Sequence, residues 1–254
     1  MFCFSLPPWR KGYAAPDFPY SIALISFFLN IMPAELLTSR DHSTLILTLS
    51  GSGAAALLQA DIHAALIETL STAESDRSLS AIVLSGLEHF APHEGKPAGT
   101  TLSASSLEHL NDWVDALFAF PKPIIAAVEG QLSGPGLSLM LACDLVVAGR
   151  HSRFKATPEL LGGLSWFLTR GLPRQFAMEM LLEIHPLPAE RLHTVGMINR
   201  LVDDGLAHDS ALEWAQQLAQ GAGHTEGIKA VLQNAWQHSL AQQLAAETQF
   251  RFEK

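Results

Sequence analysis

The sequence predicts an α/β protein built on a parallel sheet that is covered by helices. Three segments support this prediction, because TLILTL at 44–49, AIVL at 81–84 and IIAAV at 124–128 are nearly continuous apolar runs. Strands with this pattern are buried on both faces, which is typical of parallel sheets. Segments with apolar residues at helical spacing separate them, as an alternating α/β fold requires.

In the first half of the chain, each predicted strand leads into a turn or loop. The strand at 44–49 ends in the turn Ser-Gly-Ser-Gly at 50–53, and a helix with one apolar face follows at about 59–70. The strand at 81–84 leads into a loop at 86–99 that is rich in glycine, proline and histidine. This order of strand, turn and helix is that of parallel strands joined by crossover helices.

The next helix is predicted to follow Ser105 or Ser106, since serine is a favoured N-cap, and to stop at Pro121. The third strand then leads into a glycine-rich turn at 134–136 and a helix of small and aliphatic residues. A fourth apolar strand is predicted at 145–148, after which the chain becomes mostly helical.

We divide the chain into an atypical N-terminal extension at 1–31, a core at 32–185 and a C-terminal helical region at 186–254. The extension is proline-rich and runs into a short apolar stretch. We interpret it as an upstream mis-start with Met32 as the initiator, and a targeting or membrane-contact segment is the alternative. The stretch is too short to span a bilayer and lacks a small-residue cleavage site. One short strand is expected at 197–202.

Composition limits the classes of function. A content of 48% hydrophobic and 16% charged residues is typical of a well-buried globular protein or oligomer subunit. The net charge of −9 and the absence of a Lys/Arg cluster argue against nucleic-acid binding. Cys3 and Cys143 lie far apart in sequence, so neither a disulfide framework nor a cysteine metal site is predicted. We expect a cytoplasmic protein without metal and without membrane contact.

The stretch from Pro121 to Arg150 carries most of the functional information. It contains the turn Gly134-Pro135-Gly136, which opens the helix of small and aliphatic residues. A glycine-rich turn at a helix N-terminus presents free backbone N–H groups, which can bind a developing negative charge. Proline has no N–H, so the central residue of this turn cannot donate.

Several motifs in register resemble the crotonase superfamily, the enoyl-CoA hydratase/isomerase family. They are PKPIIAAVEG from Pro121, LACDLVVA ending at Ala148, RGLPR at 170–174 and LPAER at 187–191, and the likeness covers about 43–250. The resemblance implies a spiral of ββα units followed by a helical region, assembled as a homotrimer or a dimer of trimers. It also implies an acyl-CoA thioester as substrate and no further cofactor.

Family members pass through an enolate-like anion held by two backbone N–H groups, the oxyanion hole. By resemblance, the first donor is the third residue of the loop FAPHEG that starts at Phe90, which is Pro92, and the second is Pro135. Neither proline can donate. The N–H groups of His93 and Gly136, each one residue on, could replace them only if the loops shift, and the His93 ring is a further candidate.

The catalytic carboxyl groups also depart from the family pattern. The first family glutamate corresponds to Ser138, which can bind water but cannot act unaided as a general base near neutral pH. The second corresponds to Glu159 when residues are counted back from Gly163, but to Pro158 when they are counted forward from Phe154. Glu159 is therefore either the remaining catalytic carboxylate or a solvated glutamate in the first turn of a helix.

Two further departures concern substrate recognition. The segment at 50–57 has no charge where the family often has basic residues near the CoA phosphates, and the C-terminal region is shorter than the family norm. Trp166 and Phe167, in place of small residues, either narrow the acyl pocket or simply fill the core.

Three functions remain open from the sequence. The first is an enzyme with remodelled catalytic groups that hydrates or isomerises a 2-enoyl thioester. The second is an inactive acyl-thioester-binding or assembly protein. The third is an enzyme acting on a non-CoA or carrier-protein thioester.

Overall fold

The computed structural model describes residues 34–51, 53–90, 102–157, 161–235 and 238–252. Contacts along the chain separate Met1–Ile31 from Met32–Lys254, and every described helix and strand lies in the second unit. The expectations about the N-terminal extension, Pro92, His93 and Glu159 lie outside the described residues. Within them, no helix has both the length and the apolar character needed to cross a membrane.

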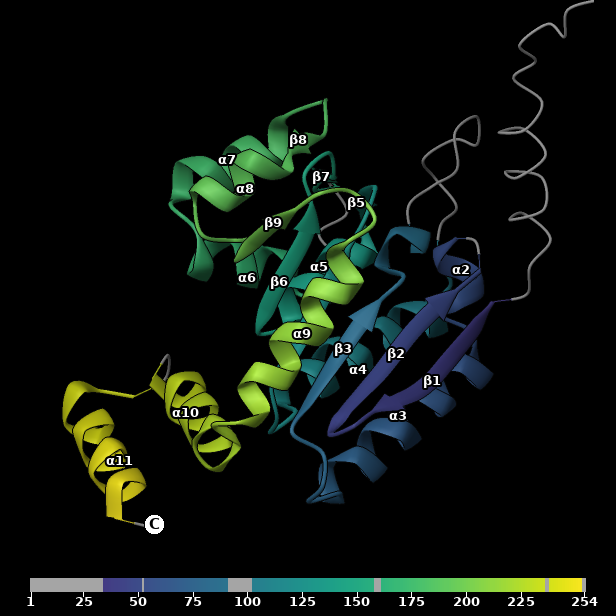
Figure 1. Ribbon diagram of the computed structural model, residues 1–254. Coiled ribbons are helices and arrows are strands. Elements are labelled where there is room, and N and C mark those ends of the chain that lie inside the picture. The colour runs from purple at the N-terminus through teal and green to yellow at the C-terminus, as the bar shows by residue number, and fades with distance from the viewer. Residues whose placement is uncertain (1–33, 52, 91–101, 158–160, 236–237, 253–254) are drawn as a thin grey trace, which may run out of the picture. The chain divides into compact units, whose positions relative to one another are not determined.

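A six-stranded sheet forms the centre of the fold, in the order β1-β2-β3-β4-β6-β9 (Figure 1). Its strands are β1 (Glu35–Asp41), β2 (Thr44–Ser50), β3 (Ala81–Ser85), β4 (Ile124–Val128), β6 (Leu145–Gly149) and β9 (Arg200–Val202). The β1–β2 pair is antiparallel and the pairs from β2 to β9 are parallel. The parallel α/β fold predicted from the apolar runs is therefore confirmed.

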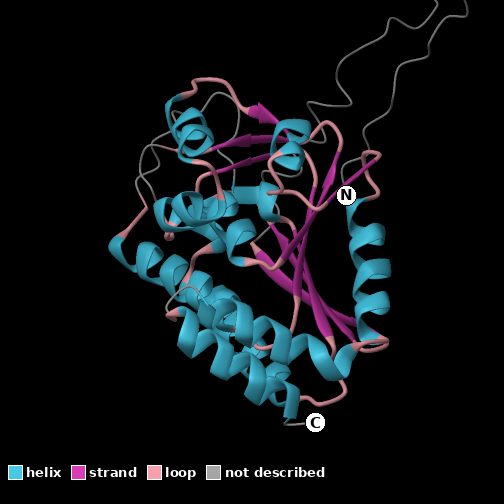
Figure 2. Cartoon of the chain, turned by 90° about the vertical axis from the view of Figure 1, so that its left-hand side faces the viewer, coloured by secondary structure: helices cyan, strands magenta, loops and turns pink. Residues whose placement is uncertain are grey.

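Helices cover both faces of this sheet (Figure 2). Ile82 and Ile124 face a core shared with α3 (Ala60–Ser75), α4 (Ala104–Ala119) and α5 (Pro135–Ala142). Their neighbours in sequence, Val83 and Ile125, face the opposite side and pack against the alanines of α9 (Ala207–Ala219). Because successive side chains of a strand point to opposite faces, a strand covered on both sides must be apolar throughout.

A small second sheet and further short elements complete the unit. The sheet contains β5 (Gln131–Ser133), β7 (Arg153–Lys155) and β8 (Leu187–Pro188). The remaining elements are α2 (Ala54–Leu57), the 3₁₀ helix η1 (Leu87–Phe90), α6 (Leu164–Gly171), α7 (Arg174–Leu182), α8 (Ala189–Thr194), α10 (Ala222–Ala235) and α11 (Leu240–Phe252). The strands of the small sheet have only two or three residues, so no periodic pattern marks them in the sequence.

Two local predictions need correction. The N-cap of α4 is Ser103, whose Oγ accepts a hydrogen bond from the N–H of Ser106 at 3.1 Å, and neither Ser105 nor Ser106 caps the helix. Strand β1 was not predicted, because most of its side chains are exposed and give no apolar alternation. Its place is fixed instead by pairing along the full length of β2.

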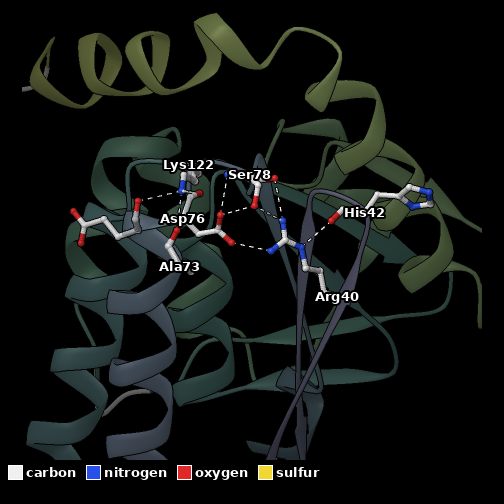
Figure 3. A network of polar contacts seen from close by, with 7 residues as sticks. Arg40, His42, Ala73, Asp76, Ser78 and Lys122 are labelled. Atoms are coloured by element: carbon white, nitrogen blue, oxygen red, sulfur yellow. Dashed lines mark hydrogen bonds and ion pairs between the residues drawn. The ribbon is translucent and has the colours of Figure 1, made fainter.

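Lys122, just before β4, caps the C-terminus of α3 (Figure 3). Its side chain is buried, and its Nζ donates to the carbonyl oxygens of Ala73, Glu74 and Asp76 at 2.7, 3.1 and 2.7 Å. The carbonyl oxygens of Ala73 and Asp76 also accept the N–H groups of Asp76 and Leu79 at 3.3 and 3.1 Å. A cation is favoured at this negative end of the helix dipole. The interaction therefore fixes the end of α3 against the start of β4.

The residues after α3 extend this network toward β1 (Figure 3). Asp76 accepts hydrogen bonds from the N–H and hydroxyl of Ser78 and pairs with Arg40 of β1 at 2.8 Å. The Ser78 donors, followed by Arg40, lower the pKa of Asp76 to about 2. This stabilisation is present above the ordinary pKa of an aspartate and is lost as the pH falls to about 2.

A buried ion pair lies beside Lys122. Lys229 of α10 is 7% exposed, and its Nζ lies 2.7 Å from Oδ2 of Asp144 and 3.3 Å from the carbonyl oxygen of Lys122. The same carboxylate oxygen accepts the N–H of Ile124 at 2.8 Å. Burial raises the pKa of Asp144, and Lys229 opposes that rise. The pair joins α10 to the starts of β4 and β6.

We expect Lys229→Ala to lower the free energy of unfolding by about 3 kcal/mol, because it leaves the Asp144 carboxylate buried without its cation. Urea denaturation followed by circular dichroism measures the change. Arg77→Ala, which removes an exposed positive charge, is the matched control. A loss as small as that of the control would show that the pair does not hold α10 in place.

Candidate active site

Helix α5 begins at the glycine-rich turn identified in the sequence. Its N-cap is Gly134, with φ of 54° and ψ of −130°, a conformation that glycine adopts without steric cost. Pro135 is the first helical residue, where its fixed φ is favourable and its missing N–H would have no partner within the helix. The proline that is unsuited to anion binding is therefore well suited to starting the helix.

The next residue, Gly136, has a backbone N–H without a partner among the described residues. By contrast, the N–H groups of Leu137 and Ser138 bond to the carbonyl oxygen of Gly134 at 3.2 and 3.4 Å. A side-chain carbon at Gly136 would lie 2.4 Å from the carbonyl oxygen of Leu87, so only glycine fits. Among the turn residues predicted to bind substrate, Gly136 can thus still donate.

The close approach of Leu87 also brings η1 to the start of α5. Phe90, the last residue of η1, lies 3.3 Å from the same side-chain position on Gly136. The loop expected to supply the other donor, with Pro92 and His93, follows Phe90 but lies outside the described residues. The two parts of the predicted oxyanion site therefore start from neighbouring points of the fold.

Ser138, the position of the first family carboxylate, is fully buried. Its hydroxyl donates to the carbonyl oxygen of Leu161 at 2.7 Å. The backbone of the following residue is also close, since a side-chain carbon at Gly162 would lie 3.0 Å from the Cβ of Ser138. The hydroxyl is thus bound to the backbone that leads into α6.

Glu159 lies outside the described residues, but residues near it on both sides are placed. Thr157, which follows β7, lies 3.9 Å from a side-chain carbon at Gly134. Leu161 accepts the hydrogen bond of Ser138. Both flanking residues therefore lie beside the first turn of α5.

Trp166 and Phe167 form a cluster of rings with Phe118 of α4. The ring centroids are 5.3 Å apart for Phe118 and Trp166, 5.7 Å for Phe118 and Phe167, and 5.0 Å for Trp166 and Phe167, all in edge-on arrangements. The guanidinium of Arg170 lies 4.4 Å from the centroid of the Trp166 ring. These contacts join α6 to the second half of α4.

One buried acid was missed by the sequence analysis. Glu88 in η1 has a buried Oε2 without a hydrogen-bond partner in the described structure. Burial raises the pKa of its carboxyl group, and the nearby charge of Glu129 raises it further. No motif marks Glu88 in the sequence, because the environment of its carboxyl group depends on burial and on Glu129, about forty positions away in the chain.

A metal centre does not emerge from the described side chains, which contain no group of three or more His, Cys, Asp or Glu placed to hold an ion. Among the described residues, the candidate site consists of the backbone N–H of Gly136, the buried hydroxyl of Ser138 and the residues on either side of Glu159.

Comparison with known proteins now decides the family. Residues 41–253 match the model of the enoyl-CoA hydratase/isomerase family. The chain belongs to this family. The 2,3-dehydroadipyl-CoA hydratase of Escherichia coli K12 is 32% identical over 231 residues, covering 85% of this chain and 88% of the relative. The 1,2-epoxyphenylacetyl-CoA isomerase of the same strain is 32% identical over 206 residues, covering 75% and 79%.

Solved structures agree with this family assignment. The crystal structure of an enoyl-CoA hydratase from Polaromonas sp. JS666 matches with a TM-score of 0.74 and 34% identity, over 86% of this chain and 90% of that one. A family protein from Silicibacter pomeroyi matches with the same TM-score at 26% identity, over 86% and 97%. The crotonase fold expected from the motifs, with its helical C-terminal region, is confirmed.

We expect Ser138→Ala to lower the free energy of unfolding by about 1–3 kcal/mol, since it leaves the carbonyl group of Leu161 without its donor. Thermal or urea denaturation provides the measurement. Ser165→Ala, an exposed serine in the nearby α6, is the control and should change stability little. Equal effects of the two substitutions would contradict a structural role for the Ser138 hydroxyl.

Proposed function

We propose that this member of the enoyl-CoA hydratase/isomerase family acts on an acyl-CoA thioester bound at the N-terminus of α5, through a strongly altered active site. The observation that carries the proposal is the N–H of Gly136, which follows Pro135 at the start of α5 and has no partner among the described residues. A backbone donor at a helix N-terminus stabilises negative charge that develops on a thioester oxygen. The CoA is part of the substrate, and no further cofactor is proposed.

The missing N–H of Pro135 limits the rate that such a site can reach. Loss of one oxyanion donor typically slows catalysis about 10²–10³-fold. Gly136 offers a donor one residue further along, and His93 remains the candidate on the other loop. The site is therefore expected to stabilise an enolate less well than a site with both family donors.

Isomerisation is favoured over hydration by the residue at position 138. The Ser138 hydroxyl donates its hydrogen bond to the carbonyl oxygen of Leu161 and is fully buried, so it cannot activate a water molecule. Moving the double bond of a 3-enoyl thioester needs only one carboxylate, which takes a proton from the α-carbon and returns it to the γ-carbon, so that a 2-enoyl thioester forms. We propose Glu159 for this role and Ser138 as a positioning residue, because it holds the backbone two residues beyond Glu159.

A second candidate function is thioester binding without turnover, in which the chain is an inactive binding or assembly protein. The burial of Ser138 supports this reading too, since the position of one family carboxylate offers no acid or base. A non-CoA or carrier-protein thioester is the remaining variant, supported by the uncharged segment after β2. Calorimetric titration with butyryl-CoA and with butyryl-pantetheine separates these substrates.

Pro135→Ala should add a backbone donor at the start of α5 and raise the isomerisation rate of 3-hexenoyl-CoA, by about 10²-fold if the new N–H faces the thioester oxygen. Ultraviolet assays of isomerisation and of crotonyl-CoA hydration measure the change. Pro173→Ala, a proline at the start of α7, is the matched control.

Two results would count against this proposal. Activity that survives Glu159→Ala unchanged would exclude Glu159 as the acid/base. Unchanged rates in Pro135→Ala would show that the N-terminus of α5 takes no part in the reaction. Binding of butyryl-CoA by the wild-type protein, with neither isomerisation of 3-hexenoyl-CoA nor hydration of crotonyl-CoA, would support the inactive binding protein instead.

We also propose that the chain forms a homotrimer or a dimer of trimers in the cytoplasm. Helices α10 and α11 expose the apolar side chains Ile228, Leu232, Leu240 and Leu244. Exposed apolar side chains gathered on two successive helices favour burial against another chain.

Light scattering of the purified protein should therefore give three or six times the mass of one chain. Leu240→Asp together with Leu244→Asp should lower that mass, because charged side chains oppose burial in an interface. Leu182→Asp, on the exposed end of α7, is the control. A wild-type mass equal to one chain would exclude the assembly.

A further inference from the structure

The space between α4 and α5 is closed at the level of Ser138. A side-chain carbon at Gly162 would lie 3.0 Å from the Cβ of Ser138 on α5 and 3.2 Å from the Cγ and Cδ2 of Leu110 on α4. Leu110 and Ser138 are both fully buried. The space between Gly162, Ser138 and Leu110 is therefore too small for even one further methyl group, only one turn beyond the start of α5.

A cluster of aromatic rings lies further along α4. Phe118, two turns beyond Leu110, packs its ring against Trp166 and Phe167 at centroid distances of 5.3 and 5.7 Å. Phe167 is also close to the turn before α6, with its Cε2 3.5 Å from a side-chain carbon at Gly163. The rings thus tie α6 to α4 and hold the backbone of the Gly162–Gly163 turn in the gap.

We propose that this chain selects short acyl groups, of acetyl to butyryl size, and that Leu110 with the Phe118–Trp166–Phe167 rings sets the limit. This inference rests on the proposed function, because it takes the thioester to lie at the N-terminus of α5. An acyl group that enters between α4 and α5 from there meets the Gly162 backbone within one helical turn, a distance of about 5 Å. The packed interior leaves no room for a longer chain unless these groups move.

The chain-length dependence of binding distinguishes a closed pocket from an open one. In a pocket that accepts the acyl chain, each added methylene tightens binding about fourfold, so octanoyl-CoA would bind about 200-fold more tightly than butyryl-CoA. In the closed pocket the added methylenes gain nothing. We expect calorimetry on the full chain to give octanoyl-CoA a dissociation constant no lower than that of butyryl-CoA.

Leu110→Ala should open space beside Gly162 and lower the dissociation constant of hexanoyl-CoA at least fourfold relative to that of acetyl-CoA. Leu117→Ala is the matched control, because it makes the same change at a buried position of the same helix. Trp166→Leu, at a partly exposed ring, is a milder second variant that should act in the same direction if Leu110→Ala does not fold.

The outcomes separate this inference from the proposed function. Tighter binding of octanoyl-CoA than of butyryl-CoA by the wild-type protein would overturn the limit on chain length and leave thioester binding intact. An equal gain in Leu117→Ala would overturn the role of Leu110, since it would reflect general loosening. Absence of binding to acetyl-, butyryl- and octanoyl-CoA alike would overturn the proposed function and this inference with it.

Discussion

Two buried lysines hold the amino ends of the central strands together. Lys122 binds the last carbonyl groups of α3, and its own carbonyl oxygen accepts a hydrogen bond from Lys229. Lys229 pairs with Asp144, whose carboxylate also binds the N–H of Ile124. Buried ammonium groups require such partners because an unpaired charge in a protein interior is very unfavourable. The end of α3, the middle of α10 and the starts of β4 and β6 are thereby fixed at one point.

With the amino ends fixed, the candidate site lies at the carboxyl ends of the same strands, as is usual in parallel sheets. There η1 follows β3, and the turn before α5 follows β4 and β5. Pro135 favours the start of helix α5 but weakens the candidate oxyanion site. Its ring suits the first position of a helix, and the same ring removes a donor that an enolate would need. One residue further on, the N–H of Gly136 has no partner among the described residues and is the donor that the start of α5 still offers.

Much of the fold could be predicted because its signals are local. Apolar runs identified the buried strands, and the motifs from Pro121 onward located the turn that opens α5. Strand β1 and the small sheet escaped prediction, since exposed or very short strands carry no periodic pattern. The partner of Ser138 could not be predicted either, because Leu161 is 23 residues away and no pattern connects a hydroxyl with a distant carbonyl group. Glu88 escaped notice for the same reason.

The sequence by itself determined the family, the parallel sheet and the absence of an N–H at position 135, since each depends on residue identity or local order. The tertiary structure alone decided that the N–H of Gly136 has no partner among the described residues and that the Ser138 hydroxyl is bound to backbone. It also decided that no further methyl group fits between Gly162, Ser138 and Leu110. These properties depend on which atoms from distant segments come within a few ångströms of each other. Packing sets those distances, and no single segment of the chain contains them.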